Sequence, residues 1–88
     1  MTSMKMKIVK ECTFISDMLC EKNEAYGDSA VAPIQIFSRL DASEGILARI
    51  DDKLSRIANS GLNDSTEDTL TDLIGYLVLL KIARENEK

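Results

Sequence analysis

Residues 63–84, NDSTEDTLTDLIGYLVLLKIAR, decide the fold of this 88-residue chain. Ser65 offers a hydroxyl to cap a helix and Asp68 a carboxylate in its first turn, so we expect a helix to begin near Ser65. No charge interrupts residues 73–80, which leaves little of the helix surface for water. The apolar positions at helical spacing are Leu70, Leu73, Ile74, Leu77 and Leu80.

A helix that is apolar on this much of its circumference needs cover on more than one side. A chain of 88 residues buries only a modest core by itself. We therefore expect a second copy of the chain to supply part of the cover, as a homodimer.

Two amphipathic helices are predicted before this stretch, from about residue 4 to residue 23 and from about 42 to 60. Turn formers before Gly27 end the first, and Asp41 caps the second. Pro33 is suited to the first turn of a short helix between them. Their apolar positions are Ile8, Cys12, Ile15 and Leu19 in the first, and Ile46, Leu47, Ile50, Leu54 and Ile57 in the second. The prediction is one all-α domain over residues 1–88, an antiparallel bundle of three main helices and a short one.

Composition excludes several classes of function. A net charge of -4, with 5% aromatic residues, argues against sequence-independent binding to a nucleic-acid backbone. With no His, the chain has no Ser-His or Cys-His nucleophile, and Cys12 and Cys20 are too few for a zinc site. We expect both thiols to be reduced, in a cytoplasmic protein. The N-terminus has no secretion-signal pattern, and the apolar run at 73–80 is far shorter than the roughly 20 residues that span a membrane.

Charged residues form two groups at helical spacing. Asp68, Asp72 and Tyr76 follow one another at intervals of four. Either the two carboxylates are a helix-start acid and a solvated residue, or they share a hard cation such as Mg²⁺. The second group lies on the helix at 42–60. It is either a solvated charge face, or its basic residues bind phosphate oxygens while its acid helps to hold a metal. Its members are Arg49, Asp52, Lys53 and Arg56.

Three short patterns carry a resemblance to a known family. They are Lys22-Asn23-x-x-Tyr26-Gly27-Asp28, Arg49-Ile50-x-Asp52-Lys53-Leu54-x-Arg56 and Asp68-Thr69-x-x-Asp72-Leu73-x-x-Tyr76. In this order they resemble the nucleotide modification associated domain, type one, of bacteriophages and bacteria, over about residues 8 to 84. The resemblance implies action on nucleotides or in pathways that modify DNA bases.

A more distant likeness is to the MazG-like all-α nucleoside triphosphate pyrophosphohydrolases. Those enzymes bind Mg²⁺ with acidic residues of two neighbouring helices, release monophosphate and pyrophosphate, and usually work as dimers or tetramers. They pair a Glu-x-x-Glu with a Glu-x-x-Asp, whereas this chain has Asp68 and Thr69 before Asp72.

The leading hypothesis is a Mg²⁺-dependent binder or hydrolase of nucleotide phosphates. Asp68 and Asp72 would be catalytic and, with Asp52, would hold the metal. The phosphates and the nucleoside would meet Lys22, Asn23, Tyr26, Arg49, Lys53, Arg56 and Tyr76. Two alternatives stay open: a non-catalytic helical module that dimerises and recruits a nucleotide-modifying enzyme, and a structural protein with solvated charge faces.

Overall fold

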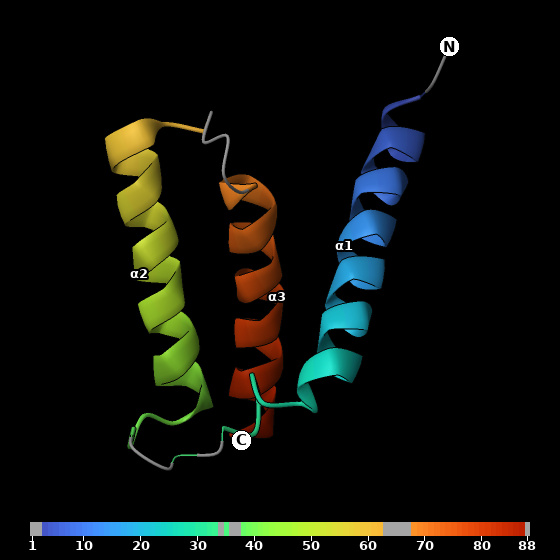
Figure 1. Ribbon diagram of the computed structural model, residues 1–88. Coiled ribbons are helices and arrows are strands. Elements are labelled where there is room, and N and C mark those ends of the chain that lie inside the picture. The colour runs from blue at the N-terminus through green and yellow to red at the C-terminus, as the bar shows by residue number, and fades with distance from the viewer. Residues whose placement is uncertain (1–2, 34, 36–37, 63–67, 88) are drawn as a thin grey trace.

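The computed structural model describes residues 3–33, 35, 38–62 and 68–87. Within these ranges the chain forms three helices and no strand: α1 (Met4–Tyr26), α2 (Ala42–Ser60) and α3 (Thr69–Asn86). Figure 1 shows α3 between the other two, with consecutive helices running in opposite directions. The predicted all-α architecture of three main helices is therefore confirmed.

The core lies between α2 and α3. Ile46 and Ile50 of α2 and Ala83 of α3 are buried together, and Leu73, Leu79, Leu80 and Tyr76 pack around them. Ser43, near the start of α2, donates a hydrogen bond of 2.5 Å to Glu87, just past the end of α3. This contact joins residues 44 apart in sequence, and it links the start of α2 to the end of α3.

The buried face of α2 differs from the predicted one. Leu47 and Leu54 are 39% and 50% exposed, although they belong to the predicted apolar stripe. Lys53 lies nearer the core instead, with only 12% of its side chain exposed. The reason is that α3 meets α2 along the Ile46–Ile50 line, which leaves one edge of the stripe outside the contact.

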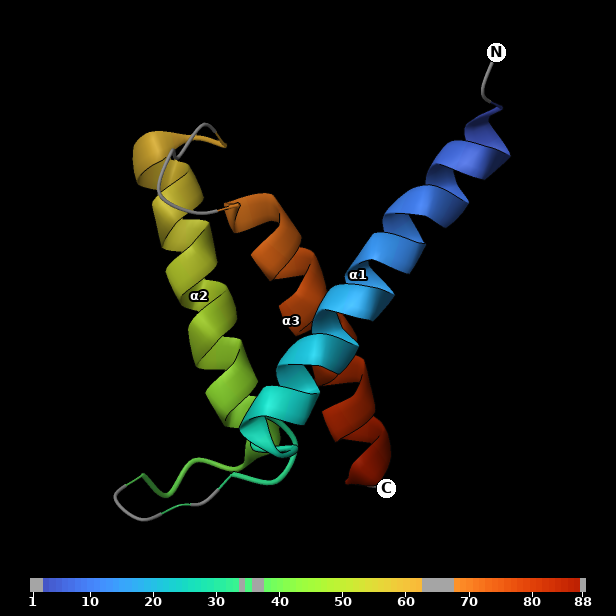
Figure 2. The ribbon, with the colours of Figure 1, turned by 45° about the vertical axis from the view of Figure 1, so that its right-hand side comes forward.

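Helix α1 packs on α3 only through its C-terminal half. Ile15 is its buried residue, and Met18 and Leu19 approach Gly75 of α3. Toward the N-terminus α1 diverges from α3, as Figures 1 and 2 both show. The face of α1 that carries Ile15 therefore continues past the end of its contact, where Ile8 is 56% exposed.

Two predicted helix ends and one predicted helix need correction. Helix α1 extends to Tyr26 before Gly27 closes it in the left-handed conformation (φ 62°), which a residue without a Cβ adopts at low cost. Helix α3 begins at Thr69 with Asp68 as its N-cap, not near Ser65, which lies outside the described residues. The described residues of the predicted short helix, 33, 35 and 38–41, are not helical.

Candidate functional site

A hollow of about 890 Å³ lies where the end of α1, the following loop, α2 and α3 meet. This volume falls within the range of about 300–1,000 Å³ that small-molecule sites occupy. Seven of the residues singled out in the sequence line it: Lys22, Asn23, Tyr26, Arg49, Asp52, Asp72 and Tyr76. We call it the central hollow. Residues up to 54 positions apart in the sequence thus share one surface.

The end of α1 supplies one wall of the central hollow. Lys22 and Tyr26 lie one turn apart, and Tyr26 is 70% exposed. The Asn23 side-chain amide donates a hydrogen bond of 2.6 Å to the Asp28 carboxylate, and the Asn23 backbone carbonyl accepts the Gly27 N–H. These bonds fix the turn after α1, so in this structure Asn23 stabilises the loop beside the hollow.

A second hollow of about 440 Å³ adjoins the first, because Arg49, Asp52 and Tyr76 line both. Lys53 and Arg56 complete its charged lining. With the Asp72 carboxylate 3.1 Å from Lys53 included, three cations and two carboxylates give it a balance of +1, unlike the chain as a whole at -4. We call it the cationic hollow. Positively charged, partly enclosed surfaces of this kind attract phosphate groups.

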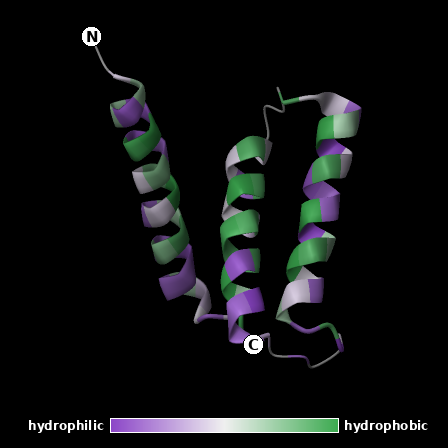
Figure 3. Ribbon diagram, turned by 180° about the vertical axis from the view of Figure 1, so that it is seen from behind, coloured by the Kyte–Doolittle hydropathy of each residue, from purple (hydrophilic) through white to green (hydrophobic). Residues whose placement is uncertain are grey.

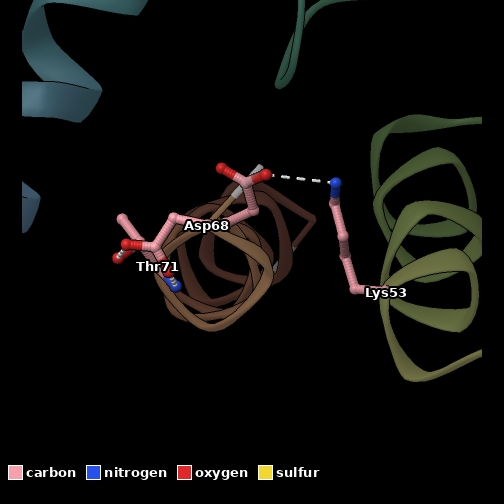
Figure 4. A network of polar contacts seen from close by, with 4 residues as sticks. Lys53, Asp68 and Thr71 are labelled. Atoms are coloured by element: carbon pink, nitrogen blue, oxygen red, sulfur yellow. Dashed lines mark hydrogen bonds and ion pairs between the residues drawn. The ribbon is translucent and has the colours of Figure 1, made fainter. Parts of the chain in front are cut away.

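Lys53 and Asp72 join α2 to α3 beside the two hollows. The Lys53 ammonium lies 3.1 Å from a carboxylate oxygen of Asp72, and the two side chains are 12% and 22% exposed. Figure 4 shows Lys53 reaching from α2 toward α3, with the dashed line marking the ion pair. Low exposure of both partners reduces screening by water, so removing one partner would leave the charge of the other partly desolvated.

Asp68 does not line either hollow within the described residues. One carboxylate oxygen accepts the Thr71 N–H at 3.0 Å and the other accepts the Thr71 hydroxyl at 2.5 Å (Figure 4). These bonds, that of the hydroxyl first, lower the pKa of Asp68 below its ordinary value. The observed role of Asp68 is to cap α3, and its proposed part in metal binding stays a prediction.

The three predicted metal ligands are not gathered as a set. Among the described residues no three Cys, Asp or Glu side chains form a group that holds a metal ion. Asp52 and Asp72, however, line the central hollow together. Mg²⁺ commonly binds to one or two carboxylates while phosphate oxygens and water complete its shell, so a magnesium site at these two residues stays a prediction.

Gly75 is the residue that sequence reasoning missed. A Cβ built on it would lie 3.2 Å from Leu19 Cδ2 and 3.3 Å from Met18 Cε, so its lack of a side chain lets α1 approach α3. This approach brings Lys22 and Tyr26 to the hollow. A glycine inside a helix costs about 1 kcal/mol relative to Ala, and this is the signal that would have indicated a packing role.

Replacing Gly75 with leucine is expected to lower the free energy of unfolding by about 1–3 kcal/mol, because the side chain overfills the α1–α3 contact. Gly75→Ala should be near neutral, since flexible side-chain ends yield and helix propensity improves by about 1 kcal/mol. Gly45→Ala in α2 is the matched control, because its Cβ meets nothing within 4 Å. Urea denaturation followed by circular dichroism measures all three. Equal tolerance of Leu and Ala at position 75 would contradict the contact.

Comparison of the chain with protein-family models, curated proteins and solved structures found no match in any of the three. The resemblance to the nucleotide modification associated domain therefore stays a prediction. Across the described residues, no helix has the length and apolar character needed to cross a membrane.

Proposed function

We propose that the two adjoining hollows bind a nucleotide, with its phosphates in the cationic hollow and its nucleoside in the central one. The observation that carries the proposal is the convergence of the residues described above on one continuous surface. Arg49 and Arg56 suit phosphate oxygens because a planar guanidinium donates two parallel hydrogen bonds. Lys53 adds a point charge, while Asp72 keeps it oriented.

The nucleoside would lie against the end of α1. Tyr26 exposes most of its ring at this wall, and an aromatic face stacks on a base with little regard to its identity. Lys22 is within one turn of Tyr26, and it offers an ammonium to a base carbonyl or a sugar hydroxyl. Tyr76 lines both hollows, so its phenol is suited to the junction of sugar and phosphate.

The proposed reaction is hydrolysis of a (deoxy)nucleoside triphosphate to a monophosphate and pyrophosphate. Asp52 and Asp72 would hold Mg²⁺, which when bound neutralises phosphate charge and lowers the pKa of a coordinated water. The chain's own residues would position the substrate: Arg49 and Arg56 on the phosphates, Tyr26 on the base. The proposal includes a cytoplasmic location and a homodimer, the latter because apolar side chains of α3 remain exposed.

A thermal-shift screen against nucleoside mono-, di- and triphosphates, with and without Mg²⁺, tests the proposal. Stabilisation by a triphosphate that requires Mg²⁺ is the expected result, because a ligand of the native state raises its stability by mass action. Pyrophosphate release from the same nucleotide then tests hydrolysis. A flat screen would favour the alternative, a helical interaction module, for which the exposed apolar side of α3 is the supporting observation.

Arg49→Met is expected to weaken binding of that nucleotide roughly tenfold to a hundredfold, the worth of one or two charge-assisted hydrogen bonds. Arg49 is exposed, so the fold should survive the change. Lys7→Met is the matched control, since Lys7 is in α1 and lines neither hollow. Isothermal titration calorimetry measures both. Equal affinity of the two variants would remove Arg49 from the site.

A further inference from the structure

Two of the side chains proposed to bind nucleotide and metal are in contact with each other. The Lys53 ammonium lies 3.1 Å from a carboxylate oxygen of Asp72, and Figure 4 shows the lysine stem extended toward α3. Lys53 lines the cationic hollow and Asp72 lines the central one, so their contact crosses the junction between the two hollows. We call this contact the junction pair. It engages both a cation suited to phosphate and a carboxylate suited to a metal ion.

The place of Asp72 on α3 explains why it needs a positive partner. Residues 73–80, which follow it, carry no charge, and Figure 3 shows hydrophobic residues over successive turns of α3. Only 22% of the Asp72 side chain and 12% of the Lys53 side chain are exposed, so water offsets the two charges incompletely. Each side chain therefore supplies the opposite charge that the other requires.

A phosphate group in the cationic hollow would compete with Asp72 for the same ammonium. Lys53 lines that hollow beside Arg49 and Arg56, and a lysine can redirect its ammonium because its four-carbon stem is flexible. Turning Lys53 toward phosphate would leave the Asp72 carboxylate partly desolvated and without its nearest cation, which is costly. A divalent cation at Asp72 would remove that cost. The two binding events therefore favour each other.

We infer that the junction pair couples phosphate binding to Mg²⁺ binding, because each ligand takes one member of the pair and exposes the other. This inference rests on the proposed function and adds to it a regulation of the same site: neither ligand alone reaches the affinity that it has beside the other. Coupling of this kind is reciprocal, so both ligands gain affinity by the same factor. Couplings between two sites are typically about 5–150-fold.

Inorganic tripolyphosphate in the presence of EDTA tests the phosphate half of the exchange, by isothermal titration calorimetry. Asp72→Asn is expected to bind it at least about fivefold more tightly than the wild-type chain, because the charge that competes for Lys53 is gone. Asp52→Asn is the matched control, since it removes one negative charge from the lining of the same hollows and leaves the junction pair in place. Asp52 is exposed, so its removal should tighten binding only about twofold.

Mg²⁺ alone, without any phosphate, tests the other half. Lys53→Met keeps the apolar stem but removes the ammonium, so Mg²⁺ becomes the cation that can offset the charge of Asp72. Half of the thermal stabilisation by Mg²⁺ is expected at a concentration at least about fivefold lower than for the wild-type chain. Arg49→Met is the matched control, because it removes a cation from the same hollow and leaves the junction pair in place. This measurement stands even if Asp72→Asn fails to fold, which circular dichroism checks.

The outcomes separate this inference from the function on which it rests. Tighter binding of each probe by its variant than by the matched control supports the exchange. If either variant folds and binds its probe no more tightly than its matched control, while the wild-type chain binds tripolyphosphate, the coupling is overturned and nucleotide binding stands. Absence of tripolyphosphate binding in the wild-type chain and in every variant would overturn both.

Discussion

Asp72→Asn is expected to lower the free energy of unfolding by about 1–3 kcal/mol, and to abolish Mg²⁺-dependent turnover. The stability effect arises because Asp72 faces the Lys53 ammonium at 3.1 Å, where only 12% of the lysine side chain is exposed. Asparagine keeps the shape but removes the charge that offsets the desolvation of the ammonium. The spacing on the helix left Asp72 either a solvated acid or a metal ligand, and the tertiary structure adds its contact with Lys53.

A double-mutant cycle of Asp72→Asn and Lys53→Met, in urea, separates the pair from the rest of each side chain's contacts. Asp51→Asn is the matched control, because Asp51 is an exposed carboxylate on α2. The control should change stability by less than about 0.5 kcal/mol. Turnover is compared well below the unfolding midpoint, so that lost activity is not lost fold. A loss of stability for Asp72→Asn no larger than for Asp51→Asn would rule out the pair as a stabilising contact.

Ile46→Ala is expected to lower the free energy of unfolding by about 2–5 kcal/mol, through lost burial and the cavity left behind. Ile46 is 4% exposed and lies in the α2–α3 core with Ile50 and Ala83. Domains are stable by only about 5–15 kcal/mol. A chain with so small a buried core belongs near the lower end of that range, so the variant should be largely unfolded in mild urea.

Leu62→Ala is the matched control, since Leu62 is 57% exposed beyond the end of α2 and should cost little. Circular dichroism and intrinsic tyrosine fluorescence follow the unfolding of both variants. If Ile46→Ala were no less stable than Leu62→Ala, the α2–α3 contact would not be the main source of stability.

The helices themselves were predictable from local patterns. The bounds of α2 agree with the prediction, because Asp41 caps its start and Gly61 ends it in a positive-φ conformation. The start of α3 was predicted too early. Both Ser65 and Asp68 are good N-caps, and only the observed bond from the Thr71 N–H to Asp68 identifies the residue that is used.

The residues of the candidate site were predictable by type and spacing, but their assembly was not. Spacing placed Arg49, Asp52, Lys53 and Arg56 on one helical face, and the structure brings them to two adjoining hollows. Spacing equally grouped Asp68 with Asp72, whereas Asp68 turns to cap its own helix. A periodic pattern predicts which residues share a helix face. It does not predict whether a side chain on that face forms a hydrogen bond within its own helix instead.

Local patterns in the sequence predicted the three helices, the caps of α2 and the faces that carry charge, because these depend on contacts within a few residues. Only the tertiary structure decided that α2 buries Ile46 and Ile50 rather than Leu54, and that α1 meets α3 at Gly75. Those outcomes depend on how two helices approach each other. The approach depends on the shapes of both helix surfaces together, so it cannot be predicted from the sequence of one helix alone.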